Sequence, residues 1–212
     1  MITIEYFGGN CVKISSQNQA AIVDPKRSVF GLEDLSTDGL IEINTENRFD
    51  NQNSKSFLQI DGPGEYEVSD FSVRAFAANR QTDFNNELSV TNYAINVDDI
   101  NIVILGNIAN NLSDAQLEEL GVADILIAPI GGGGYTLDAK AAADLVTKIE
   151  PKIVIPVHYA EAGLNYEVQQ DDFTKFANEL GSPVAETDVY KIKKRDAIPE
   201  SLEIIKLKLK LK

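Results

Sequence analysis

Short apolar runs rich in β-branched residues follow one another through the first half of the chain. Gly, Asn and Ser in residues 8–10 and 16–18 separate the first three runs, and Asp24-Pro25 ends the third because proline cannot donate to a strand ladder. Residues 44–56 and 77–87 are polar and have the composition of loops. The pattern predicts strands over residues 2–7, 11–15, 20–23, 40–43, 57–60, 65–68, 71–76, 90–97 and 100–105.

The second half alternates between strand-like and helix-like segments. Ser113 and Gln116 have the spacing of a capping box, which predicts a short helix that ends at Leu120. Strands first, followed by alternating strands and helices, predict an α+β fold in which helices pack outside a central pair of sheets. In this half we expect further helices over residues 138–150 and 171–180, and strands over 123–130 and 153–157.

The C-terminal residues 202–212 show period-two alternation, which is typical of a strand with one buried face. The simplest interpretation is an edge strand whose lysines prevent pairing with another sheet. The alternative is a basic contact stripe for an acidic partner. The residues concerned are Leu207, Leu209 and Leu211, alternating with Lys206, Lys208, Lys210 and Lys212.

Composition is that of a soluble globular chain, with 212 residues of which 43% are apolar. We expect one domain over residues 1–212 and no membrane span, because no apolar run approaches the roughly 20 residues that a membrane helix needs. The first residues lack a basic region followed by an apolar block, so we expect no secretory signal there. Cys11, the single cysteine, gives no sign of an oxidising compartment, and we expect a cytoplasmic protein.

The chain is acidic, with 33 acidic against 19 basic residues and a formal net charge of −14. Affinity for nucleic acid depends largely on neutralising phosphates with lysine and arginine. Such a charge therefore disfavours nucleic acid as a partner, apart from whatever the lysines of the C-terminus could contribute locally.

Three segments, in order, resemble the metallo-β-lactamase superfamily, and most closely its branch of ascorbate-phosphate-lactonase-like short hydrolases. The resemblance implies a four-layer αββα sandwich, with a site at the edge where strand-end loops meet. Residues beyond 165 match poorly. The matching stretches are IEYFGGNCV at 4–12 with IVDP at 22–25, IDGPGEYEV at 60–68, and ILGN at 104–107 with ADILIAPIGG at 123–132 and IEPKIVIPVHY at 149–159.

The resemblance also implies a pair of metal ions, held by a His-x-His-x-Asp-His loop, a later histidine, a bridging aspartate and a final histidine. Zinc requires imidazole, thiolate or carboxylate donors at about 2 Å. This chain has one histidine, which is too few for such a site. By this resemblance the family's metal-site positions correspond to Gly9, Asp24, Thr45, Asn47, Phe49, Asp50, Asn107 and His158, with a register in the loop that could slip by one.

Other features of the resemblance also oppose metal binding. The later histidine should fall near residues 75–82, and Arg74 and Arg80, which lie in this region, would instead repel a cation. Asn107 stands in place of the bridging aspartate and Gly9 in place of a histidine in the opening turn. Asp24 normally supports the metal loop from behind. His158 keeps its place, and we interpret it as a structural hydrogen-bonding residue, with a role in binding a non-metal ligand as the alternative.

A glycine run, Gly131-Gly132-Gly133-Gly134, follows an apolar strand and precedes a helix. A loop of this kind can hold an anion at a helix N-terminus, with Tyr159 nearby, although a tight turn is the simpler interpretation. Glu65 and Glu67 share one face of a strand, but we interpret their segment as structural, and Cys11 as an inert apolar residue.

The sequence therefore predicts a non-catalytic pseudo-hydrolase that acts as a binding or scaffold module, with no catalytic residues and no cofactor. The alternative is a residual zinc hydrolase that uses the weak candidate ligands Asp50, Asn107 and His158, or a metal-free enzyme. The expected partner is a small ligand or a protein, neither nucleic acid nor membrane. A homo-oligomer could form if the tail strand adds to a neighbour's sheet.

Overall fold

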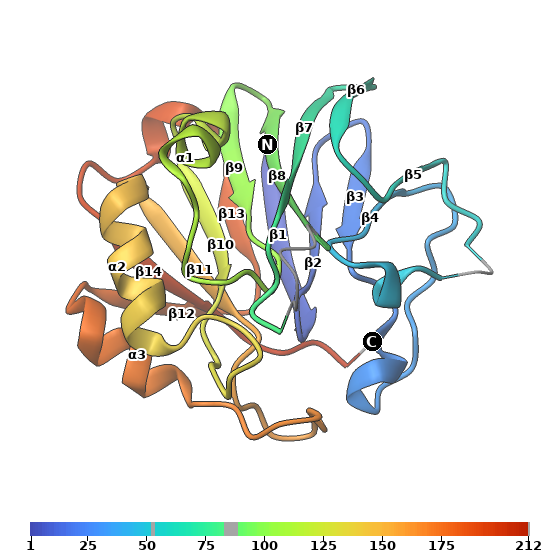
Figure 1. Ribbon diagram of the computed structural model, residues 1–212. Coiled ribbons are helices and arrows are strands. Elements are labelled where there is room, and N and C mark those ends of the chain that lie inside the picture. The colour runs from blue at the N-terminus through green and yellow to red at the C-terminus, as the bar shows by residue number, and fades with distance from the viewer. Residues whose placement is uncertain (52–53, 83–88, 212) are drawn as a thin grey trace.

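Two β-sheets face each other in the computed structural model, which describes residues 1–51, 54–82 and 89–211 (Figure 1). The predicted polar loops at 44–56 and 77–87 and the end of the tail therefore lie partly outside the described residues. The six-stranded sheet has the order β13 (Tyr190–Ile192), β1 (Ile2–Gly8), β2 (Cys11–Ser15), β3 (Ala20–Val23), β4 (Ile41–Ile43) and β5 (Leu58–Ile60). The eight-stranded sheet has the order β12 (Val184–Thr187), β14 (Glu203–Leu207), β11 (Ile153–Val157), β10 (Ile125–Pro129), β9 (Ile100–Ile104), β8 (Val90–Val97), β7 (Phe71–Ala78) and β6 (Gly64–Val68).

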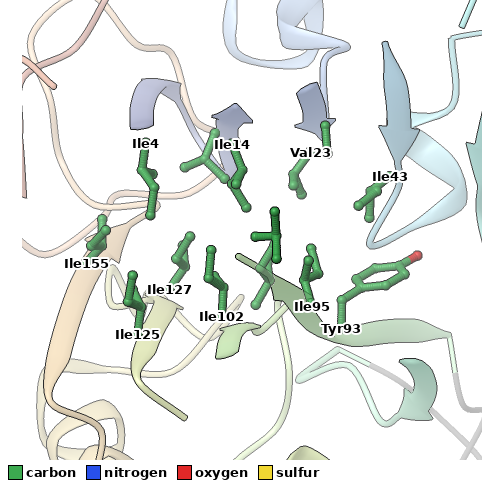
Figure 2. Close-up of a cluster of buried hydrophobic side chains, with 14 of the residues drawn as sticks. Ile4, Ile14, Val23, Ile43, Tyr93, Ile95, Ile102, Ile125, Ile127 and Ile155 are labelled. Atoms are coloured by element: carbon green, nitrogen blue, oxygen red, sulfur yellow. The ribbon is translucent and has the colours of Figure 1, made fainter. Parts of the chain in front are cut away.

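The core lies between the two sheets and consists mainly of β-branched side chains. Because side chains alternate along a strand, every second residue of each strand points to the opposite sheet. Figure 2 shows Ile4 and Ile14 of the six-stranded sheet facing Ile125, Ile127 and Ile155 of the eight-stranded sheet, all of them fully buried. Burial of each such side chain contributes roughly 1.5–3 kcal/mol, so this layer holds the two sheets together.

Helices cover the outer face of the eight-stranded sheet, as Figure 1 shows. Each begins where the sequence places an N-cap: Ser113, Asp138 and Asp172 accept a hydrogen bond from a backbone N–H of the first turn. The capping box and the helix stop at Gly181, which is left-handed, are confirmed. The helices are α1 (Asp114–Leu120), α2 (Ala139–Ile149) and α3 (Phe173–Leu180).

A loop segment covers part of the outer face of the six-stranded sheet. There Phe7, Cys11 and Ile22 form a small buried cluster with Leu35 and Leu40. The segment contains the 3₁₀ helix η1 (Arg27–Phe30); two further 3₁₀ turns are η2 (Asn47–Phe49) and η3 (Arg195–Ala197). No helix within the described ranges is both long enough and apolar enough to cross a bilayer.

The prediction of an edge strand at the C-terminus is wrong. β14 is an inner strand that pairs with β11 on one side and with β12 on the other. The reason is β12, a strand the sequence analysis did not predict, which covers β14 and becomes the edge itself. The lysines of the tail pair with carboxylates of this chain: Lys206 with Glu186, Lys208 with Asp188 and Lys210 with Glu5.

The tail continues beyond β14 and crosses to the other sheet. Leu209 bridges to Tyr6, and the amide of Lys210 donates to the Tyr6 carbonyl at 2.9 Å. The buried guanidinium of Arg27 donates to the backbone carbonyls of Phe7, Lys210 and Leu211 at 3.1–3.3 Å. The tail thereby links both sheets beside the end of β1.

Candidate functional site

Loops from both sheets converge at one edge of the sandwich (Figure 1). β3, β4, β9, β10 and β11 run so that their C-terminal ends lie at this edge, next to the β1–β2 turn. Hydrogen bonds between these loops confirm the convergence: the amide of His158 donates to the Gly9 carbonyl at 2.8 Å, and that of Thr91 donates to the Thr45 carbonyl at 2.9 Å. Side chains far apart in sequence therefore meet here.

A chain of hydrogen bonds starts at His158. Its Nδ1 lies 3.0 Å from Asn10 Oδ1, and Asn10 Nδ2 donates to Asn107 Oδ1 at 3.2 Å. Asn107 Nδ2 in turn donates to Glu46 Oε1 at 2.5 Å. Because the Asn10 amide oxygen can only accept, this arrangement places the imidazole proton on Nδ1.

Glu46 is the centre of the site. Its side chain is only 2% exposed, and its second carboxylate oxygen lies 3.1 Å from Arg80 Nη1 and 3.4 Å from Arg48 Nε. The guanidinium groups are 31% and 23% exposed, so they shield the carboxylate from water. One buried negative charge is thus held between two positive charges and one amide donor.

Aromatic rings enclose the Arg48 guanidinium and His158. The guanidinium carbon lies 4.5 Å from the ring centroids of both Phe49 and Tyr135. The His158 ring is stacked on Tyr135 at 5.7 Å and contacts Tyr166 at 4.8 Å and Phe30 edge-on at 5.5 Å. These rings leave His158 only 1% exposed.

Burial determines the protonation of the two ionisable residues deepest in the site. It lowers the pKa of His158 to about 3, with a smaller contribution from the positive charge of Arg48, so the imidazole is neutral. Burial also raises the pKa of Asp24 to about 7, against hydrogen bonds from Thr45 N at 2.7 Å and Thr45 Oγ1 at 2.6 Å. Both residues have positive φ, 50° and 47°, as strained residues at functional sites often do.

His158 predicts a dependence of stability on pH. The unfolded chain binds a proton at this residue near pH 6.5 and the folded chain only near pH 3, so the contribution of His158 to the free energy of unfolding should fall by about 1.4 kcal/mol per pH unit between 6.5 and 3. Asp24 acts in the opposite sense, because its raised pKa favours the folded state at low pH. We therefore expect urea denaturation at pH 7, 6, 5 and 4 to show that the free energy of unfolding decreases less on acidification in His158→Asn than in wild type. Parallel curves for the two proteins would contradict the assignment.

Comparisons with known proteins identify the family and the fold of this chain. A family model for the beta-lactamase superfamily domain matches residues 3–158, well over half of the chain. The chain belongs to the metallo-β-lactamase superfamily. The family and fold predicted from the sequence are thus confirmed.

Two UPF0173 proteins are similar in sequence. That of Pyrococcus abyssi is 28% identical over 165 residues, which are 77% of this chain and 67% of the relative. That of Pyrococcus furiosus is 40% identical over 63 residues, so the match covers only 30% of this chain and 28% of the relative.

Solved structures of the superfamily have the same fold. A protein from Thermotoga maritima, described as a Zn-dependent hydrolase, superposes with a TM-score of 0.76 at 19% identity, covering 98% of this chain and 100% of that one. Igni18, a metallo hydrolase from Ignicoccus hospitalis, gives a TM-score of 0.60 at 16% identity, covering 85% and 90%. At these identities the likeness concerns the fold alone.

The structure places the residues predicted for the superfamily's metal loop in different surroundings. Thr45 turns toward Asp24, and Asn47 is exposed. Phe49 is fully buried and packs on Phe30 at 5.9 Å. Asp50 accepts a hydrogen bond from Gln59 of β5 at 2.7 Å.

Residues beside the predicted loop positions form the centre instead. Glu46 and Arg48 are each one position from the preferred register, which was expected to be uncertain by one residue. Asn107 and His158 do meet, through Asn10, a link that sequence reasoning missed. One signal in the sequence could have identified Glu46. In an extended segment neighbouring side chains point to opposite sides, so if Thr45 faces Asp24, Glu46 faces away from it.

Gly9 and Gly131 each allow a close contact that a side chain would prevent. A Cβ on Gly9 would lie 2.0 Å from the Phe30 ring, and one on Gly131 would lie 2.2 Å from Gln170 Oε1. The run ends at Tyr135, which sequence reasoning missed and which reaches His158. An anion site at Gly131–Gly134 stays a prediction, although the side chain of Asp138 already caps the helix that follows.

The remaining candidates lie away from the Glu46 centre. Tyr159 is stacked on Tyr6 at 6.1 Å and packs against Phe173 of α3. Glu65 and Glu67 are exposed on the edge strand β6. Burial raises the pKa of the Cys11 thiol, as expected for an inert residue.

The donors at this edge do not fit a zinc pair. Within residues 1–51, 54–82 and 89–211, no three His, Cys, Asp or Glu side chains converge as metal ligands. The one central carboxylate, Glu46, is engaged by two guanidinium groups, and Asn107 is a neutral amide. A divalent cation placed here would face Arg48 and Arg80 at close range, which Coulomb repulsion disfavours.

Proposed function

We propose that this chain is a non-catalytic member of the metallo-β-lactamase superfamily that serves as a binding or scaffold module. The observation that supports this most strongly is the position of Glu46 between Arg48 and Arg80, in the loop to which the resemblance to the superfamily assigns metal ligands. The positive charge at this edge is supplied by the protein itself. No cofactor is part of the proposal.

The energetics of the centre support this proposal. A buried carboxylate is costly unless it is paired and hydrogen-bonded, and Glu46 has both kinds of partner. Binding a metal would require Glu46 to leave the two guanidinium groups, which would then remain beside a cation. The neutral His158 imidazole, already donating through Nδ1, could offer only its other nitrogen.

The surroundings of His158 support the proposal as well. Hydrolysis needs water and substrate to reach the reacting centre, but Phe30, Tyr135 and Tyr166 pack directly on the imidazole. These rings leave little room for a substrate beside the His158 imidazole, which is 1% exposed. The cytoplasmic location expected from the sequence stays a prediction.

Metal analysis of protein purified without chelator tests the proposal. We expect under about 0.1 equivalent of zinc, iron and manganese by mass spectrometry, because the donor set is too poor to hold them. We also expect the melting temperature to be the same with added zinc and with chelator, because only a ligand that binds the folded state raises it.

One or two equivalents of metal would contradict the proposal. The decisive control is His158→Asn, in which metal bound at this edge should disappear while metal bound elsewhere on the surface should remain. Zinc that is lost in this variant would favour the alternative, a residual zinc hydrolase with Asp50, Asn107 and His158 as candidate ligands.

A further inference from the structure

A small pocket opens beside the Glu46 centre, between the 160–170 loop and the glycine run. Arg48, Tyr135, His158, Tyr166 and Gln170 line it. Its volume is about 10 Å³, room for about one water-sized group. The pocket shares Arg48 and His158 with the site described above, but Glu46 does not line it.

Several buried polar atoms on residues that line this pocket have no hydrogen-bond partner among the described residues. The donors are Arg48 Nη2, the hydroxyls of Tyr135 and Tyr166, and Arg48 Nε, which is 3.4 Å from Glu46; the acceptor is Gln170 Oε1. Donors buried in this way are rare in folded proteins, and each one that persists calls for a water, an ion or a ligand. Burial, aided by the charge of Glu46, raises the pKa of Tyr135, so its phenol stays protonated and available to donate.

The charges around the pocket favour an anionic acceptor. The guanidinium of Arg48 shares the single carboxylate of Glu46 with Arg80, so that carboxylate neutralises neither guanidinium fully. His158, on the floor of the pocket, is neutral. The side chain of Glu167 is 70% exposed. Its carboxylate oxygen lies 3.8 Å from Arg48 Nη1, which is too far for a hydrogen bond.

We propose that this pocket binds a carboxylate group. The inference rests on the proposed function as a binding module and names its ligand class: a small molecule that carries a carboxylate. One oxygen of the carboxylate fits the water-sized space and accepts from Arg48 Nη2 and the Tyr135 hydroxyl, while the remainder of the ligand extends toward solvent. The exposed Glu167 carboxylate competes only weakly with the ligand for the Arg48 guanidinium.

Sodium formate is the probe, titrated into the full chain labelled with ¹⁵N, with sodium chloride at equal ionic strength as the reference. We expect saturable shifts of the Arg48 Nε–H resonance and the Tyr135 amide, with a Kd on the order of 1 mM for so small a ligand. Tyr135→Phe, which removes only the hydroxyl, should weaken binding about tenfold, and Arg48→Gln should abolish it. Arg74→Gln, an exposed arginine on β7, is the matched control and should bind as wild type does.

Three results would overturn the inference: the absence of saturation, unchanged binding in Tyr135→Phe, or equal saturation by chloride. The spectrum of Tyr135→Phe reports whether that variant is folded, so a loss of binding there is interpretable. Metal analysis of the same samples separates the two proposals. If metal-free protein does not bind formate, the carboxylate site alone is refuted. If formate binding disappears when chelator is added, the proposed function is refuted.

Discussion

Replacement of Glu46 by glutamine should lower the free energy of unfolding by about 3 kcal/mol. Removing one partner of a buried ion pair typically costs 3–5 kcal/mol, because the other partner keeps an uncompensated charge. The lower end applies here, since Arg48 and Arg80 are 23% and 31% exposed and water can partly solvate them. Urea denaturation at pH 7 measures the change.

Glu167→Gln is the matched control for this prediction. Glu167 also approaches Arg48, but at 3.8 Å and with a side chain 70% exposed, so its removal should change stability by less than about 0.5 kcal/mol. If the two substitutions had equal effects, the Glu46 carboxylate would not be the central charge of the site.

Replacement of Gly9 by alanine should also destabilise the fold, by about 3 kcal/mol. Its φ of 59° costs a residue with a Cβ about 1–2 kcal/mol, and the new Cβ would lie 2.0 Å from the Phe30 ring. The ring cannot yield easily, because it packs against Phe49, His158 and Tyr166. Overpacking of this kind adds about 1–3 kcal/mol.

Gly39→Ala separates the two contributions. Gly39 has a similar φ of 70°, but a Cβ there would meet no atom within 4 Å, so this variant should lose only the backbone cost of about 1–2 kcal/mol. Equal losses at Gly9 and Gly39 would show that Phe30 moves freely. The double variant Gly9→Ala with Phe30→Ala should be less destabilised than the sum of its parts, because the contact is then absent.

The contact between Gly9 and Phe30 has a consequence for the history of the site. The resemblance to the superfamily expects a histidine at the position of Gly9, but the Phe30 ring occupies the space that its Cβ would need. One substitution cannot therefore restore a metal ligand there.

The sequence predicted most of the local structure because each element is marked by nearby residues. The capping side chains of Ser113, Asp138 and Asp172 and the left-handed Gly181 set helix ends within one turn. The hairpin at Asp98-Asp99 forms because both residues adopt positive φ, 50° and 60°. The shortage of histidine was visible from composition alone.

The sequence by itself indicated the superfamily, the positions of the helices and of the strands other than β12 and β13, and the presence of a single histidine. Only the tertiary structure decided that β14 is an inner strand, that Glu46 rather than Thr45 points into the site, and that Arg80 meets it from 34 positions away. The physical reason is the sequence separation over which each interaction acts. Alternation along a strand reports which face is buried, but strand neighbours and ion pairs depend on which distant segments fold against each other.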